Sequence, residues 1–112
     1  MSIINVTKKT LLDAVSLVSD QTSSVQNIDN IISFAVQFTW EGGTTINGTL
    51  TVEGSLDGEN FVPVEQLALV NEDDGNYLVN IERAGYSYMR ANYDFTSGTG
   101  GTLTVLFNSK RV

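Results

Sequence analysis

Carboxylates on two turns are the residues with the most obvious chemical potential in this sequence. Asp57 and Glu59 belong to one turn, and Asp73 and Asp74 belong to another. Carboxylate oxygens on turns are ligands that Ca²⁺ accepts in proteins. Neither turn has the spacing of an EF-hand loop, and acidic residues on turns commonly do no more than solvate them. We therefore predict no cofactor and no metal site, and calcium at these two turns is the open alternative.

Glu53 and Glu65 are the pair that could act in glycoside hydrolysis, which needs two carboxylates about 5–10 Å apart. Neighbouring strands could bring them to that distance, but nothing nearby in the sequence would raise the pKa of one of them, as acid catalysis requires. The chain has no histidine and no cysteine. Histidine-based triads, thiolate nucleophiles and disulfides are therefore excluded. We predict that the protein is not an enzyme.

Aromatic and polar side chains alternate along one predicted strand near the C-terminus. Tyr86, Tyr88, Arg90 and Asn92 are spaced two apart, which places them on one face of a strand. Tyrosine and arginine are enriched where proteins bind proteins, and aromatic rings also stack on sugars. These four residues are predicted interface residues. A covering sheet or arm is the structural alternative for this face.

A second set of candidates lies near the N-terminus and at the end of another strand. Lys8 and Lys9 are predicted interface residues within a segment, residues 1–9, that would form either an edge strand or an N-terminal arm. Trp40 is predicted to pack in the core with the rest of its strand face. In the glycan-binding alternative, its place at the end of the strand would let it reach the surface and contact a glycan together with Tyr86 and Tyr88.

The net charge of −7 argues against two classes of partner. The six basic residues are scattered rather than clustered, whereas phosphate backbones bind to clustered lysine and arginine. We expect no nucleic acid and no anionic lipid surface as a partner. No apolar run reaches the eighteen residues of a membrane-spanning helix, and the N-terminus lacks the pattern of a secretory signal.

The elements that must position these residues are predicted to be strands. In residues 31–40, Ile32, Phe34, Val36, Phe38 and Trp40 alternate with smaller or polar residues, which predicts a strand with one buried face. Residues 48–61 predict a hairpin with its turn at Asp57-Gly58, because glycine supplies the positive φ of such turns.

The remaining segments follow the same logic. We predict strands at residues 14–19, 77–81, 86–95 and 102–108, a loop at 20–30, and a short basic tail at 109–112. Pro63 predicts that its strand lies at a sheet edge or is interrupted there, because proline cannot donate a ladder hydrogen bond. Together these segments predict an all-β protein of one domain, residues 1–112, built as an antiparallel, jelly-roll-like β-sandwich of seven or eight strands.

Several motifs in combination resemble the small β-sandwich structural proteins of tailed bacteriophages. They are SFAVQFTW at 33–40, GTLTVEGSLDGENF at 48–61, YMRANY at 88–93 and SGTG at 97–100. The hairpin and the Tyr-x-Arg strand also resemble discoidin and other galactose-binding-like jelly rolls. The resemblance covers roughly residues 31–108.

This resemblance implies a virion component assembled in a host cytoplasm. The expected function is non-enzymatic: a capsid-decorating, auxiliary, neck or tail protein that packs against other virion proteins as a homo-oligomer or on a lattice. The alternative is a carbohydrate-binding module that attaches to glycans.

Overall fold

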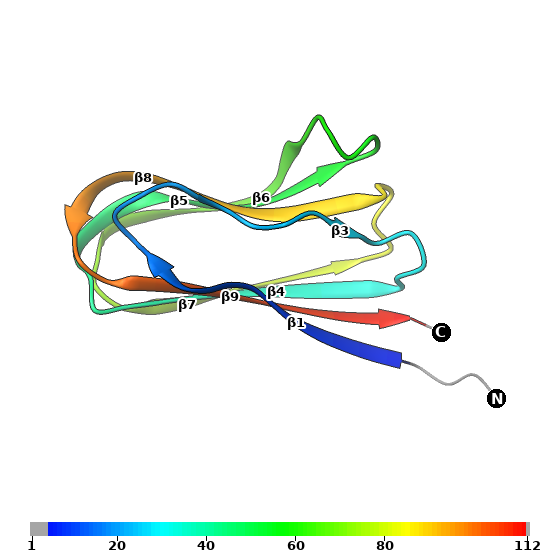
Figure 1. Cartoon of the computed structure of the whole chain (residues 1–112), viewed down its shortest axis with the longest axis horizontal. Coiled ribbons are helices and arrows are strands. Elements are labelled where there is room, and N and C mark those ends of the chain that lie inside the picture. Colours follow the sequence, from blue (N-terminus) through cyan, green and yellow to red (C-terminus); the bar gives the residue numbers. More distant parts are fainter. Residues whose placement is uncertain (1–4, 112) are drawn as a thin grey trace.

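A computed structural model of the chain describes residues 5–111 as two antiparallel sheets packed face to face (Figure 1). The four-stranded sheet contains, in spatial order, β1 (Asn5–Ser16), β9 (Thr102–Arg111), β4 (Ser33–Glu41) and β7 (Gly75–Glu82). The five-stranded sheet contains β8 (Tyr88–Thr99), β5 (Thr44–Ser55) and β6 (Val62–Glu72), with β2 (Gln21–Thr22) and β3 (Gln26–Asn27) on the other edge of β8. The predicted all-β sandwich is confirmed.

The order of pairing is that of a jelly roll. The first strand pairs with the last, β2 and β3 pair with β8, β4 pairs with β7, and β5 pairs with β6. This pattern arises when one long hairpin is rolled up so that its two arms divide between two sheets. Because β2 and β3 lie on the same edge of β8, they act as one interrupted strand. Residues 5–111 form nine strands rather than the predicted seven or eight, and counting β2 and β3 as one interrupted strand gives eight.

Strand β4 shows why the sequence folds into a sandwich. Phe34, Val36, Phe38 and Trp40 are all buried, and the residues between them are only partly covered. A period of two places all four on the inner face, where they meet the core residues of the opposite sheet. Ile32, which was predicted to share this face, precedes the strand and is 40% exposed.

Strand β1 differs from its prediction in length. It is continuous from Asn5 to Ser16, so residues 5–9 are an edge strand rather than a free arm, and the strand predicted at 14–19 ends at Ser16. The pairing with β9 shifts register between Thr10 and Leu12 and again between Leu12 and Val15, and Ala14 has a φ of 46°. Each bulge adds a residue to one strand, which breaks the alternation that sequence analysis relies on. Residues 1–4 lie outside the described part of the chain.

Two further segments are more ordered than expected. The predicted loop at 20–30 contains β2 and β3, which cover the edge of β8. The predicted basic tail is mostly strand, because Ser109–Arg111 belong to β9; Val112 lies outside the described residues.

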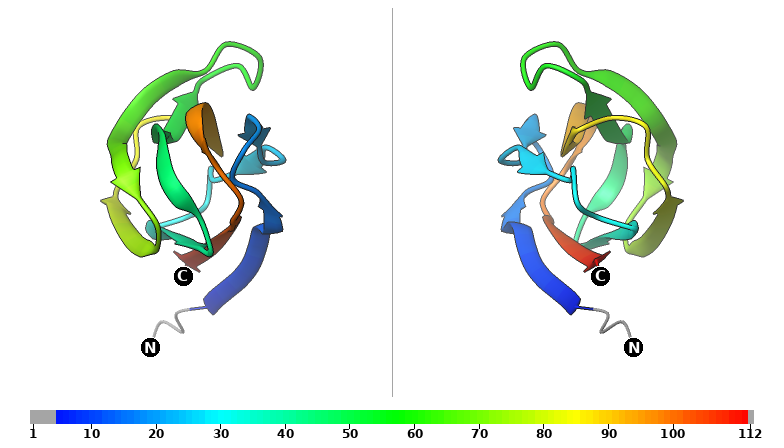
Figure 2. Two further views of the ribbon diagram at one scale, coloured as in Figure 1. Left: turned by 90° about the vertical axis from the view of Figure 1, so that its left-hand side faces the viewer. Right: turned by 90° about the vertical axis from the view of Figure 1, so that its right-hand side faces the viewer.

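The edges and turns of the sandwich agree better with the sequence. Pro63 lies in β6, which is an edge strand as predicted. Gly58 has a φ of 77° in the turn after β5. That turn projects from the five-stranded sheet, on the side away from the four-stranded sheet (Figure 1, Figure 2). Among residues 5–111, the structure has no helix that could cross a membrane.

Candidate functional site

Three of the four residues predicted along the C-terminal strand share the outer face of β8. Tyr88, Arg90 and Asn92 are half-buried, while Met89 and Ala91 between them point into the core. They pair across to β5 at Ser55, Glu53 and Thr51 respectively. The strand therefore positions them side by side on the outside of the five-stranded sheet, as predicted.

Arg90 is engaged on both sides by residues of the same chain. Its Nε donates a 2.7 Å hydrogen bond to Glu53 Oε1, which makes an ion pair. Its guanidinium carbon lies 4.1 Å from the centroid of the Phe61 ring. A cation over an aromatic face and a carboxylate beside it both stabilise the charge locally. Arg90 thus fastens β8, β5 and the start of β6 to one another.

The neighbours of Arg90 on this face, Asn92 and Tyr88, also contact other residues of the same chain. Thr22 Oγ1 donates a 2.7 Å hydrogen bond to Asn92 Oδ1, which ties β2 to β8. The turn after β5 lies beside the Tyr88 ring. A Cβ atom added at Gly58 in this turn would be 3.5 Å from Tyr88 Cδ2, which is van der Waals contact. An interface role for Tyr88, Arg90 and Asn92 stays a prediction. Of the three, Tyr88 is the one whose side chain makes no hydrogen bond or ion pair with the described residues.

Tyr86 does not lie on the outer face, so its predicted orientation is wrong. Its ring packs edge-on against Phe34 with centroids 6.5 Å apart, and a Cβ on Gly54 would be 2.8 Å from Tyr86 Cδ2. Strand β8 starts only at Tyr88. The chain bends before that residue, and the bend turns the Tyr86 side chain toward the core. The Tyr86 hydroxyl is buried and has no hydrogen-bond partner among the described residues. Burial, and secondarily the charge of Glu65, raise its pKa.

The prediction of the glycan-binding alternative, that Trp40 reaches the surface, is also wrong. Trp40 is 2% exposed, and its ring lies over Gly75, the residue it pairs with on β7. Glycine at that position leaves room for the indole. Of the three residues proposed for a glycan site, only Tyr88 therefore faces outward.

The acidic turns are occupied by hydrogen bonds from their own backbone or from a neighbouring turn. Asp57 Oδ1 accepts from the backbone amides of Glu59 and Asn60, each at 2.8 Å, and these bonds lower the pKa of Asp57. Asp73 and Asp74 accept from the backbone amides of Thr45 and Gly42 at the β4–β5 turn.

The two acidic turns lie at opposite ends of β6, so they do not form one site. No group of three or more acidic side chains within residues 5–111 converges as a metal site would require. The carboxylates serve as turn and capping acceptors in this fold, which is an established use of aspartate.

Glu53 and Glu65 do not face each other. Glu53 points to the outer face and binds Arg90, whereas Glu65 pairs with Val52 and so lies on the other side of the sheet. A register shift between Val52 and Glu53 separates them further. The pair that glycoside hydrolysis would need is not assembled.

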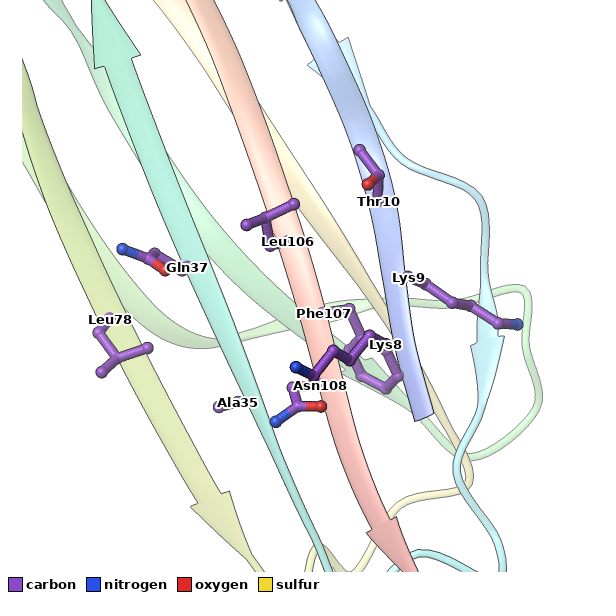
Figure 3. A pocket seen from close by; sticks show the side chains of 9 residues that line it. All are labelled: Lys8, Lys9, Thr10, Ala35, Gln37, Leu78, Leu106, Phe107 and Asn108. Atoms are coloured by element: carbon purple, nitrogen blue, oxygen red, sulfur yellow. The ribbon is translucent and has the colours of Figure 1, made fainter. Parts of the chain in front are cut away.

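A groove with a volume of about 540 Å³ lies on the outer face of the four-stranded sheet (Figure 3). We call it the lysine groove. Strands β1, β9, β4 and β7 all contribute to it. Its lining residues are Lys8, Lys9, Thr10, Ala35, Gln37, Leu78, Leu106, Phe107 and Asn108.

The two predicted lysines take different positions at this groove. Lys8 pairs with Asn108 and lies over the groove, whereas Lys9 turns away toward β3 (Figure 3). Lys9 Nζ donates a 3.1 Å hydrogen bond to Gln26 Oε1, which links the two sheets at this edge. Lys8 is therefore the lysine available to a partner in the groove.

Two exposed leucines in the lysine groove were missed by sequence analysis. Leu78 is 65% exposed and Leu106 is 43% exposed. Each falls between core residues of its strand, Leu78 between Tyr77 and Val79 and Leu106 between Val105 and Phe107. The period-two pattern already assigns such positions to the outside, and a leucine there is the signal that could have found them.

Comparisons with known proteins place the fold but not a family. No protein-family model matches the chain, and no curated protein matches it. The crystal structure of the SPBc2 prophage-derived protein YomS is similar over 98% of this chain and 96% of that one, with a TM-score of 0.63 and 13% identity.

Two larger structures share the same fold over part of their length. VP2 in the subviral particle of infectious bursal disease virus has a TM-score of 0.65 and 12% identity over 96% of this chain, which spans 32% of that protein. A structure described as a CBM4 has a TM-score of 0.50 and 9% identity over 82% of this chain and 61% of its own. The resemblance to phage β-sandwich proteins is thus confirmed at the level of the fold.

Proposed function

We propose that the protein is a non-enzymatic structural component of a bacteriophage virion and acts by protein–protein assembly. A capsid-decorating or other auxiliary position, or one at the neck or tail, would suit such a component. The support is twofold: the fold is shared with a prophage-derived protein and a viral particle protein, and one face of the sandwich has the composition of an interface.

The composition of that face is the observation that carries the proposal. The chain has thirteen acidic residues and a net charge of −7. On the outer face of the four-stranded sheet, the register assigns two carboxylates to outward-facing strand positions, Glu41 at the end of β4 and Glu82 at the end of β7. The outward-facing positions are Val6, Lys8, Thr10, Ser16, Ser33, Ala35, Gln37, Thr39, Glu41, Asn76, Leu78, Asn80, Glu82, Thr102, Thr104, Leu106, Asn108 and Lys110.

A surface of this kind suits contact with another protein. The centres of protein interfaces are depleted in charged residues and enriched in apolar ones. Both carboxylates lie at strand ends, so the centre of the face, around Gln37, Leu78 and Leu106, carries none. This centre is therefore weakly charged and loses little on desolvation.

The engagement of the polar candidates supports binding rather than catalysis. Glu53 is neutralised by Arg90, and Asp57 holds its own turn. A general acid or base needs a side chain within reach of a substrate and with a matched pKa. The residues that could have served are committed to the fold.

Quantitative mass spectrometry of purified particles tests the proposal directly. Particles of the phage that encodes this chain should contain it in a fixed ratio to the major structural proteins, and it should remain after gradient purification. An antibody to the chain should label the particles in electron microscopy. Particles that are complete and infectious without any of this chain would overturn the proposal.

Carbohydrate binding is the second candidate, favoured by the aromatic surface around Tyr88. Tyr88 and Phe61 are both half-exposed near the turn after β5, and the fold is shared with a CBM4 structure. Because Trp40 is buried, tryptophan fluorescence would not report a bound sugar at this surface. Chemical-shift changes confined to Tyr88 and its neighbours on adding a glycan would support this candidate, and a glycan panel without response would reject it.

A further inference from the structure

The turn between β5 and β6 complements the lysine groove in shape and in charge: it projects and carries a carboxylate, whereas the groove is concave and carries a lysine. This turn, residues 56–61, projects from the five-stranded sheet, while the groove lies on the outside of the four-stranded sheet (Figure 1, Figure 3). Leu56 is 75% exposed at its start, and Glu59 is exposed at its tip. The turn thus presents an apolar side chain beside negative charge. The groove presents exposed leucines beside Lys8.

The turn is held in one shape before any partner binds. Asp57 Oδ1 accepts backbone amides of Glu59 and Asn60, and Asp57 Oδ2 accepts Asn60 Nδ2 at 2.7 Å. Ser55 Oγ accepts the amide of Gly58 at 3.0 Å. A segment that is already ordered loses little conformational entropy when it docks. It can therefore contribute to binding more than a mobile loop of the same composition.

We propose that the turn at residues 56–61 of one copy of this chain docks into the lysine groove of a second copy. Leu56 would pack against Leu78 and Leu106, and Glu59 would lie beside Lys8. The proposal rests on the proposed assembly function and names the partner for one of its surfaces. A second copy fits because its turn supplies both an apolar side chain for the exposed leucines of the groove and a negative charge for Lys8.

The placement of the two surfaces determines the kind of assembly. Turn and groove lie on opposite faces of the sandwich, so the contact is between two different patches. Such head-to-tail contacts leave one turn and one groove unoccupied in a pair, and they build a closed ring or an extending array. The groove volume of about 540 Å³ falls within the range of about 300–1,000 Å³ typical of ligand-holding concavities.

A charge exchange between the two surfaces tests the contact. Light scattering coupled to size exclusion should show concentration-dependent association of the unaltered chain. Glu59→Lys alone and Lys8→Glu alone should each weaken association at least about tenfold, because each places like charges together. A chain with both changes should associate again, since residue 59 of one copy meets residue 8 of the next. Raised salt should weaken self-association of the unaltered chain, because it screens the attraction between Glu59 and Lys8. A variant whose copies are held together by apolar contact alone should not respond to salt in this way.

Matched variants separate this contact from general charge effects. Asp94→Lys makes the same charge change as Glu59→Lys at an exposed position on β8, and it should not rescue Lys8→Glu. Leu56→Ser should weaken association at unchanged charge, and its melting temperature should stay near that of the unaltered chain because the side chain is exposed. Failure of the double exchange to restore association would overturn the proposal.

The outcome in solution is independent of the outcome for the particles. A chain that stays monomeric up to about 1 mM, where a contact would contribute only about 4 kcal/mol, has no such contact. If purified particles nevertheless contain the chain, the proposed function stands and the docking of turn into groove fails. If the particles lack it, the virion role fails whatever the solution mass shows.

Discussion

The guanidinium carbon of Arg90 lies 4.1 Å from the centroid of the Phe61 ring, and its Nε is 2.7 Å from Glu53 Oε1. One side chain therefore connects the beginning of β8, the end of β5 and the residue that leads into β6. Sequence analysis assigned Arg90 to an interface because arginine is common there. In the structure its Nε donor and its flat face are already in use within the chain.

Replacing Arg90 should test this structural role. Arg90→Ala removes the ion pair and the contact with Phe61, so we expect the free energy of unfolding to fall by about 1–2 kcal/mol. Arg90→Lys keeps the charge but loses the planar group that stacks on the ring, and should recover only part of the loss. Chemical denaturation of the variants measures both values.

A control and a cycle make the test specific. Arg83 is exposed on the turn after β7, and Arg83→Ala should change stability by no more than about 0.5 kcal/mol. In a double-mutant cycle, Arg90→Ala and Glu53→Gln should not be additive. Additive effects would show that the ion pair contributes nothing and that Arg90 acts through packing alone.

Tyr86 supplies a second test, because its hydroxyl is buried without a hydrogen-bond partner among the described residues. Tyr86→Phe keeps the ring against Phe34 and Gly54 and removes an unsatisfied polar group. We expect stability to be unchanged or to rise by up to about 1 kcal/mol. Tyr86→Ala should instead cost about 2–4 kcal/mol, because it leaves a cavity at the core edge. Thermal unfolding distinguishes the two, and a loss in Tyr86→Phe comparable to that of Tyr86→Ala would mean that the hydroxyl is bonded.

Tyr88 differs from Tyr86 although only Ser87 separates them. Its ring lies on the outer face beside the turn at residues 56–61. Tyr88→Ala should leave the fold intact and weaken self-association, because the turn loses a neighbour that supports its shape. Tyr88→Phe keeps the ring and should associate like the unaltered chain. Loss of the folded state in Tyr88→Ala would place the residue in the core and reject its interface role.

The contrast between these tyrosines shows how far the sequence could lead. Alternation of period two predicted the buried faces of β4 and β8 correctly, because both strands are regular through their centres. The same alternation failed at Tyr86, because the strand does not extend to that residue. Pattern analysis has no means of locating a bend that is fixed by contacts with a distant glycine, here Gly54.

Other features could not be predicted from the sequence for related reasons. The bulges of β1 disrupt its alternation, and β2 and β3 are too short for any periodic signal. Trp40 was a candidate for the surface only because it ends its strand, and the space made for it by Gly75 is a property of pairing with β7. The lysine groove is formed by residues of four strands that are far apart in the chain, so no local sequence motif could predict it.

Tyr93 gives a prediction that depends on pH. Its hydroxyl donates a 2.7 Å hydrogen bond to the carbonyl oxygen of Leu17, and the side chain is fully buried. Burial, with a smaller contribution from the charge of Asp20, raises the pKa of Tyr93 to about 12 from an ordinary value of 10.0. Below pH 10.0 the phenol is neutral in the folded and the unfolded chain, so the full stability is present.

Above that pH the unfolded chain loses the proton and the folded chain keeps it. The free energy of unfolding should therefore fall between the two pKa values, by at most about 1.4 kcal/mol per pH unit. Denaturation at a series of alkaline pH values measures the slope. Tyr93→Phe should be less stable at neutral pH by about 1–2 kcal/mol, because the Leu17 carbonyl loses its donor. It should also show a shallower alkaline slope, since the raised pKa of Tyr93 no longer contributes while those of Tyr77 and Tyr86 still do. An equal slope in the variant would mean that Tyr93 ionises with its ordinary pKa and that its hydroxyl is not held by Leu17.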